Sequence, residues 1–151
     1  MSLTRIKVET ILIRRLGGLL TEAELDGTST DGGNLDLNDP IGWAIRQCSG
    51  TVTNFTTVSD ADLASVSSAD YDKLLDLAEY RTLQSISGNL AVVDIQVGPR
   101  RESLSQLVER IEARIARKLK QIQTDYGFGL GTLEAGVIGL DFMTKGTDGN
   151  V

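Results

Sequence analysis

The segment from Pro99 to Tyr126 has the longest unbroken periodicity in the chain, and it constrains the fold more than any other feature. Its apolar residues recur at steps of three or four, the spacing of one helix face and close to a heptad seam: Leu104, Val108, Ile111, Ile115, Leu119, Ile122 and Tyr126. Proline suits a first helical turn, and Gly127 predicts the helix end. Because a helix of about 25 residues is roughly 37 Å long, we expect part of the apolar stripe to pack on another helix or another chain.

Two earlier segments also have helical spacing. The first, Leu3–Leu16, has Thr4 as a candidate N-cap and is predicted to end at Gly17-Gly18. A strand over Ile6–Ile13 is the alternative, because β-branched residues are frequent there. The second opens at Asn38-Asp39-Pro40, where either polar residue can cap the helix, and it is predicted to end at Gly50. Its apolar face consists of Ile41, Ala44, Ile45 and Cys48.

A third helix is predicted over Ala69–Ser87, with Gly88-Asn89 as its C-cap. Ser59-Asp60-Ala61-Asp62 looks like a further helix start. Thr51–Thr57 is predicted to be a short extended segment or an ordered loop, and Leu90–Val97 a short strand or an extended linker. The sequence therefore predicts a mainly α fold, a small bundle of about four helices with short β segments.

The predicted domain organisation is a helical bundle over residues 1–126 and a glycine-hinged C-terminal arm over residues 127–151. The arm is predicted to be a strand or an extended segment that pairs with another sheet edge, in a neighbouring copy or another partner. Its apolar residues are Leu133, Val137, Ile138, Leu140 and Phe142. The glycines at its start do not form a nucleotide loop, because they follow a helix and precede an apolar tail.

Charge is distributed unevenly along the chain, whose net charge is −6. The segment Glu22–Asp39 has six acidic residues and no basic one, and the part over residues 19–37 is predicted to be a mobile surface loop. Its spacing does not match an EF-hand calcium loop. The segment Arg100–Lys120 has seven basic residues against three acidic ones. An acidic and a basic surface on one small protein indicate head-to-tail pairing between copies; the alternative is a solvated helix face with internal ion pairs.

The amino-acid composition argues against a catalytic function. The chain has no histidine, which excludes Ser-His-Asp and Cys-His nucleophilic systems and histidine-ligated zinc. The single cysteine, Cys48, excludes an internal disulfide and is predicted to be a buried thiol. No apolar run is long enough to cross a membrane, and the N-terminus has no signal-peptide core. We expect no catalytic residue, no cofactor and no metal; a carboxylate-metal enzyme with ligands Glu102, Glu109 and Asp125 remains an open alternative.

Candidate interface residues come from three segments. Trp43 lies off the apolar face of its predicted helix, so it is either a second core contact or an anchor in a subunit interface. Arg100 and Arg101 lie at a helix start, where the helix dipole disfavours cations, so they either contact an anionic group of a partner or are simply solvated. The candidate interface set is Trp43, Arg100, Arg101, Arg114, Arg117 and the five apolar residues of the arm.

Two tracts, Tyr71–Leu83 (YDKLLDLAEYRTL) and Gly98–Leu107 (GPRRESLSQL), resemble small structural proteins from tailed-bacteriophage morphogenesis clusters. The nearest type is the head–tail connector, or adaptor, and the resemblance covers residues 38–123. It implies a non-enzymatic virion protein that forms a ring under the portal, commonly of twelve copies, and joins capsid to tail. The partners implied are other copies, the portal and a tail or neck protein, with DNA passing through the ring without sequence-specific binding.

The same resemblance implies a location at the head–tail junction of the virion, and in the host cytoplasm during assembly. A different class remains open: a small helical scaffold or regulatory protein that binds a partner helix in a groove. A stable, compact dimer in solution would favour that alternative.

Overall fold

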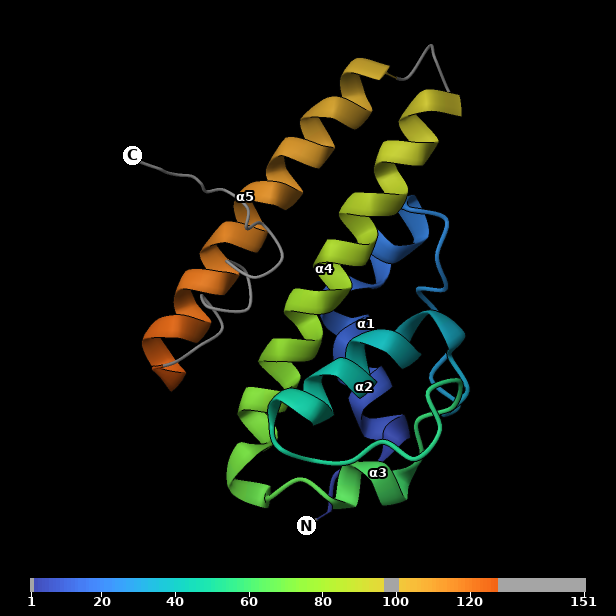
Figure 1. The fold of residues 1–151 in the computed structure, drawn as a ribbon. Helices are drawn as coiled ribbons and strands as arrows, with labels where there is room; N and C mark the ends of the chain where they lie inside the picture. The colour runs from blue at the N-terminus through green and yellow to red at the C-terminus, as the bar shows by residue number, and fades with distance from the viewer. Residues whose placement is uncertain (1, 97–100, 128–151) are drawn as a thin grey trace, which may run out of the picture. The chain divides into compact units, whose positions relative to one another are not determined.

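α-Helices make up most of the described part of the chain (Figure 1). The structure, a computed structural model, describes residues 2–96 and 101–127. Within these ranges there is no β-strand, so the mainly α prediction is confirmed, and the predicted β segments are not found there. The helices are α1 (Arg5–Glu22), α2 (Asn38–Gln47), α3 (Asp60–Ala64), α4 (Tyr71–Gln96) and α5 (Arg101–Tyr126), with 3₁₀ turns η1 (Leu35–Leu37) and η2 (Ser68–Asp70).

The chain divides into two units, Met1–Ile115 and Ala116–Val151. The first contains α1 to α4 and the N-terminal part of α5. In the second, the structure describes the remainder of α5 and Gly127, whose φ of +62° ends the helix as predicted. The predicted C-terminal arm lies outside the described residues.

Helix α4 is the centre of the first unit, because both α1 and α2 pack against it (Figure 1). Its fully buried apolar residues lie on more than one side of the helix: Leu74, Leu77 and Ala78 share one side, and Leu83, Ile86 and Leu90 share another, as expected of a central helix with neighbours on several sides. The predicted apolar face of α2 is also confirmed: Ile41, Ala44, Ile45 and Cys48 are all buried.

Helix α1 begins as predicted, because the Thr4 side chain accepts a hydrogen bond from the backbone N–H of Lys7. The predicted end at Gly17-Gly18 is wrong, since the helix continues to Glu22. Gly17 is glycine for a packing reason: a Cβ there would lie 2.8 Å from the backbone oxygen of Gly27. The loop that follows α1 returns against the helix at this point, and only two glycines allow the backbones to come so close.

Helix α4 runs through Gly88-Asn89, where the sequence predicts a C-cap, and the extended segment predicted over Leu90–Val97 is helical as far as Gln96. The fully buried Leu90 continues one buried side of α4 beyond Gly88, so packing outweighs the low helix propensity of glycine. Asn89 caps a different helix: its side-chain amide donates to the backbone oxygen of Ala23 at the end of α1, at 3.3 Å.

Two corrections concern helix α2. The predicted side-chain cap from Asn38 or Asp39 is absent, because Leu37 occupies the N-cap position and makes no side-chain bond there. The sequence predicts that the helix ends at Gly50, whereas α2 ends at Gln47 and the left-handed residue after it is Ser49, whose φ is +63°. The backbone N–H of Gly50 then bonds to the oxygen of Ile45 at 2.9 Å, which closes a Schellman-type turn.

The predicted surface loop over residues 19–37 is shorter than expected, since its first residues belong to α1 and its last to η1. Helix α5 confirms the long periodic segment, beginning at Arg101 and ending at Tyr126. None of the helices in the described ranges combines the length and the apolar character that a bilayer crossing requires.

Candidate functional site

A buried ion pair joins the first turns of α1. Arg5 is 3% exposed, and its Nε donates to Oε1 of Glu9 at 2.8 Å. Its NH1 donates to the side chain of Asn38 at 2.6 Å and to the backbone oxygen of Val58 at 3.0 Å. Its NH2 donates to the backbone oxygen of Asn34 at 2.6 Å. The guanidinium therefore connects α1 to the acidic loop, to the start of α2 and to the loop before α3.

The carboxylate of Glu9 also binds the backbone of the acidic loop. Its two oxygens accept the backbone N–H groups of Gly32, at 2.7 Å, and of Asn34, at 3.0 Å. Within the same loop, hydrogen bonds from Ser29 and Thr28 lower the pKa of Asp26 to about 2. The loop is thus ordered by hydrogen bonds to fixed carboxylates, in contrast to the mobile loop that its composition predicts.

A second buried carboxylate, Asp62, orders the loop between α2 and α3. The helix start predicted at Ser59-Asp60-Ala61-Asp62 is confirmed, and Asp62 and Ser59 form a capping box there. Asp62 also accepts the backbone N–H and the hydroxyl of Thr53, each at 3.0 Å. Burial raises the pKa of Asp62, but the hydrogen bonds from Ser59 and Thr53 together outweigh it, so the net pKa is lowered.

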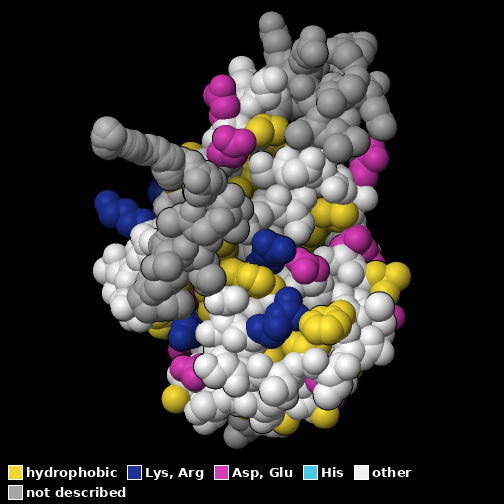
Figure 2. All heavy atoms as spheres, in the orientation of Figure 1, with side chains coloured by type: hydrophobic (Ala, Val, Ile, Leu, Met, Phe, Trp, Pro, Cys, Tyr) yellow, Lys and Arg dark blue, Asp and Glu magenta, His cyan; other side chains and the backbone are white. Residues whose placement is uncertain are grey.

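An aromatic–arginine surface lies where this loop meets α2 and α4; we define it as Asp39, Trp43, Arg46, Phe55 and Arg81. The Arg81 guanidinium carbon lies 5.6 Å from the ring centroid of Trp43, and Nε of Arg81 donates to Asp39 at 3.0 Å. The guanidinium carbon of Arg46 lies 5.2 Å from the ring centroid of Phe55. Figure 2 shows Lys or Arg side chains directly beside hydrophobic ones over this part of the molecule.

Phe55 is strongly exposed, with 71% of its area accessible. The backbone that presents it is fixed, because the Asn54 side chain accepts the Thr56 N–H at 3.0 Å and Asn38 donates to the Thr56 oxygen at 2.7 Å. A small hollow of about 50 Å³ separates this loop from α2. Together with Trp43, Arg46 and Arg81, this exposed aromatic side chain on a hydrogen-bonded loop forms a surface of the kind that binding sites use.

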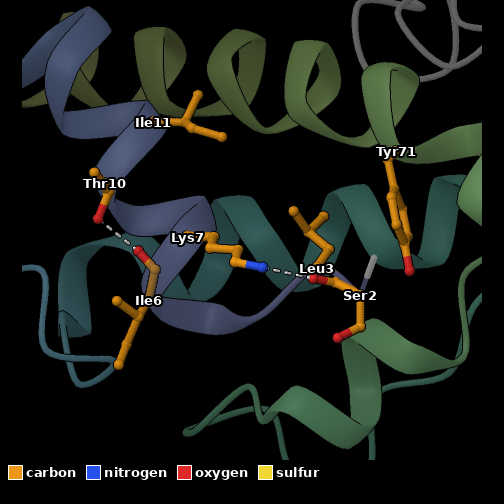
Figure 3. A pocket seen from close by; sticks show the side chains of 7 residues that line it. All are labelled: Ser2, Leu3, Ile6, Lys7, Thr10, Ile11 and Tyr71. Carbon is orange, nitrogen blue, oxygen red and sulfur yellow. Dashed lines mark hydrogen bonds between the residues drawn. The ribbon is translucent and has the colours of Figure 1, made fainter.

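An apolar pocket of about 290 Å³ opens on a different part of the first unit (Figure 3). Tyr71 contributes to it from the start of α4, and the other residues come from the N-terminal segment and α1. The pocket is lined by Ser2, Leu3, Ile6, Lys7, Thr10, Ile11 and Tyr71. Its polar groups are engaged: the Lys7 ammonium donates to the Ser2 oxygen at 3.1 Å, and the Thr10 hydroxyl donates to the Ile6 oxygen at 2.8 Å.

The predicted interface residues occupy different environments. Trp43 is half-buried: its ring centroid lies 6.1 Å from that of the buried Tyr80, and it also contacts Arg81. It is therefore a contact within its own chain, and its role as an anchor in a subunit interface stays a prediction. Arg114 lies 3.7 Å from the buried carboxylate of Glu79, which also binds Arg15 at 2.8 Å. Arg117 is exposed in the second unit.

The other predicted interface residues cannot be placed with them. Arg101 is the first residue of α5, where the structure describes only the backbone. Arg100 lies outside the described residues, as do all the arm residues: Leu133, Val137, Ile138, Leu140 and Phe142.

Sequence reasoning missed Phe55, Arg46 and the apolar pocket. The available signal for Phe55 was a lone aromatic residue within a run of threonines and asparagine, which the alternating pattern presented as part of an extended segment. The pocket had no sequence signal, because Leu3 and Tyr71 are far apart in the chain and each fits an ordinary helix pattern.

The described residues offer few groups for redox or metal chemistry. Cys48 is a buried free thiol, as predicted, and burial raises its pKa to about 11, so it is a poor nucleophile at neutral pH. Among the residues whose side chains the structure describes, 2–90 and 105–127, there is no group of three acidic or cysteine side chains that could hold a metal ion. Glu109 and Asp125 are exposed, and the side chain of Glu102 is not described.

Comparison with protein-family models, with curated proteins and with solved structures gave no match for this chain.

Proposed function

We propose that this chain is a non-enzymatic structural protein of a tailed-bacteriophage virion, a head–tail connector that assembles as a ring under the portal. The proposal starts from the resemblance of Tyr71–Leu83 and Gly98–Leu107 to that class. The observation that carries it furthest is the aromatic–arginine surface, with Phe55 exposed on a rigid loop. Tryptophan, tyrosine and arginine are the residues most enriched among those that dominate the energy of protein–protein contacts.

The buried charges support a scaffold role. Arg5, Glu9 and Asp62 each make several short hydrogen bonds, and their partners belong to loops and helix ends. These bonds hold the loops at defined positions, as a protein with repeated contacts to fixed partners requires. The net charge of −6 also supports passage of DNA through a ring of such subunits, because like charges repel.

The mass of the protein in solution and on the portal tests this proposal. Native mass spectrometry and electron microscopy of the full chain should show a closed ring, alone or on a purified portal ring from the same phage. A chain truncated after Gly127 should lose ring closure or portal docking if the C-terminal arm reaches a partner. Truncation without effect removes the role of the arm, whereas a full chain that neither forms a ring nor binds the portal contradicts the function.

The alternative, a small scaffold or regulatory protein that binds a partner helix, is favoured by the apolar pocket on α1. A groove with aliphatic side chains at helical spacing and one aromatic wall is a common receptor for an amphipathic helix. A compact dimer that is stable in solution, with no ring on the portal, would support this alternative.

A further inference from the structure

Phe55 and the apolar pocket are complementary features of the same unit, Met1–Ile115. Phe55 is 71% exposed and is not among the residues that line the pocket, so it does not fill the pocket of its own copy. Both lie within Met1–Ile115, and the residues that line the pocket are different from those that line the hollow beside Phe55. One copy therefore carries a protruding aromatic ring and, elsewhere, an open apolar receptor.

The size of the pocket suits an aromatic ring. A cavity of about 150 Å³ with aliphatic walls is known to bind benzene, and this pocket has a volume of about 290 Å³. Figure 3 shows Ile11 and the ring of Tyr71 apart from each other, with Leu3 between them, so an inserted ring would meet both aliphatic and aromatic partners.

The charges around the two features are also complementary. Arg46, which is exposed, lies directly beside Phe55. Near the pocket, the exposed Asp60 accepts the backbone N–H of Arg5 at 2.6 Å, one residue from Ile6, and the exposed Asp72 directly follows Tyr71. The pocket lining also contains the Lys7 ammonium, which donates to the Ser2 oxygen, and Asp39 beside Arg46 is paired with Arg81. Arg46 thus accompanies the aromatic ring, and the carboxylates of Asp60 and Asp72 outnumber the ammonium of Lys7 at the receptor, which favours this orientation of two copies.

We propose that Phe55 of one copy inserts into the pocket formed by Leu3, Ile11 and Tyr71 of the next copy, with Arg46 facing Asp60 or Asp72. Because the two surfaces differ, the contact is heterologous: each copy retains one free ring and one free pocket, so repetition produces a closed ring or an open filament. The inference rests on the proposed function in one respect, since it assigns the contact between copies that a ring requires.

Two single variants test the contact from opposite sides. Phe55→Asp removes the inserted ring and leaves the pocket intact, and Leu3→Asp places a charge in the pocket and leaves Phe55 intact. Leu3 precedes α1 and is half-buried, so the second change does not disturb the core. Leu35→Asp is the matched control, because Leu35 is another exposed hydrophobic residue, 75% accessible, that lines neither feature.

Sedimentation velocity and native mass spectrometry provide the measurement, and circular dichroism confirms that each variant is folded. We expect the wild type and Leu35→Asp to assemble, and each of the other two variants to remain a monomer. An equimolar mixture of Phe55→Asp and Leu3→Asp should form a heterodimer and stop there, since only one productive contact remains. Phe55→Ser replaces Phe55→Asp if the charged variant is unfolded.

The possible failures are distinguishable. Assembly of Phe55→Asp to the same mass as the wild type overturns the inference and leaves the connector proposal intact. If the wild type is monomeric alone but forms a ring on the portal, the same variants are compared for the number of copies bound, and equal numbers overturn the inference. A wild type that assembles under neither condition overturns both, and binding of an isolated amphipathic helix to the pocket then supports the alternative function.

Discussion

At the scale of single residues, two helix ends are followed by residues that have an unfavourable, left-handed backbone conformation. Among the described residues, Glu24 and Ser49 have positive φ without being glycine, at +61° and +63°. Each lies just after a helix end, where a left-handed residue allows the next N–H to reach back to an earlier carbonyl. Glycine is the usual choice at such a position, so each of these helix ends retains some strain.

Substitutions at Ser49 and Gly50 should have opposite effects on the free energy of unfolding. Ser49→Gly should raise the free energy of unfolding by up to about 1 kcal/mol, because it removes the left-handed strain. Gly50→Ala should lower it by about 1–3 kcal/mol, because a Cβ there would lie 2.6 Å from the Ile45 side chain. Urea unfolding of both variants checks the pair. Equal stabilities for the two would show that the turn does not have the described geometry.

Asp62 gives stability a dependence on pH. Its pKa is lower in the folded chain than in the unfolded chain, so its contribution is complete above the unfolded value, near pH 4, and is lost as pH falls through the folded value. Asp62→Asn should therefore melt at a lower temperature than the wild type at pH 7. The difference in melting temperature should narrow below pH 4, because protonation of Asp62 weakens the same hydrogen bonds in the wild type.

Thermal melts at pH 7, 4 and 2.5 measure this difference. Glu112→Gln is the control, because Glu112 is exposed on α5; it should change the melting temperature little at any pH. A difference for Asp62→Asn that stays constant down to pH 2.5 would contradict the assignment.

At the scale of elements, glycines within helices have two different roles. Gly17 lies against the backbone of Gly27, so its missing side chain allows the loop to pack on α1. Gly18 is exposed, and a Cβ added there would meet no other group within 4 Å, so nothing in its surroundings requires glycine. The sequence presents the two as one stop signal, although the helix passes through both.

Alanine scanning separates these roles. Gly18→Ala should stabilise the protein by up to about 1 kcal/mol, the difference in helix propensity. Gly17→Ala should destabilise it by about 1–3 kcal/mol, because the added methyl group would force α1 and the loop apart. Chemical denaturation of the two variants provides the measurement. Stabilisation by Gly17→Ala would mean that the contact with Gly27 is not formed.

At the scale of the whole molecule, Arg5 joins segments that are distant in the chain. Its guanidinium binds groups from α1, the acidic loop, the start of α2 and the loop before α3. Removing the arginine would leave Glu9 as a buried charge without its counter-ion, since Glu9 is fully buried. Breaking such a pair costs more than the pair itself contributes, because the remaining charge has lost its water.

Arg5→Met should therefore lower the free energy of unfolding by about 3–5 kcal/mol. Arg14→Met on the same helix is the matched control, and its effect should be within about 0.5 kcal/mol because Arg14 is exposed. Hydrogen exchange should also show faster exchange at Gly32 and Asn34 in Arg5→Met. If both variants are equally stable, the buried network does not hold the loops.

Local periodicity determined much of this protein from the sequence alone: the helical class, the buried apolar residues of α2 and α4, the long α5, the Thr4 cap and the helix start at Ser59. These features depend on residues within one or two helical turns, so their spacing is visible in the chain. Only the tertiary structure decided where helices pass through glycine, because the buried Leu90 and the close approach of Gly27 to Gly17 come from packing between segments. It also decided the candidate site, since Phe55 is placed beside Arg46, and Leu3 beside Tyr71, by contacts that no local pattern records.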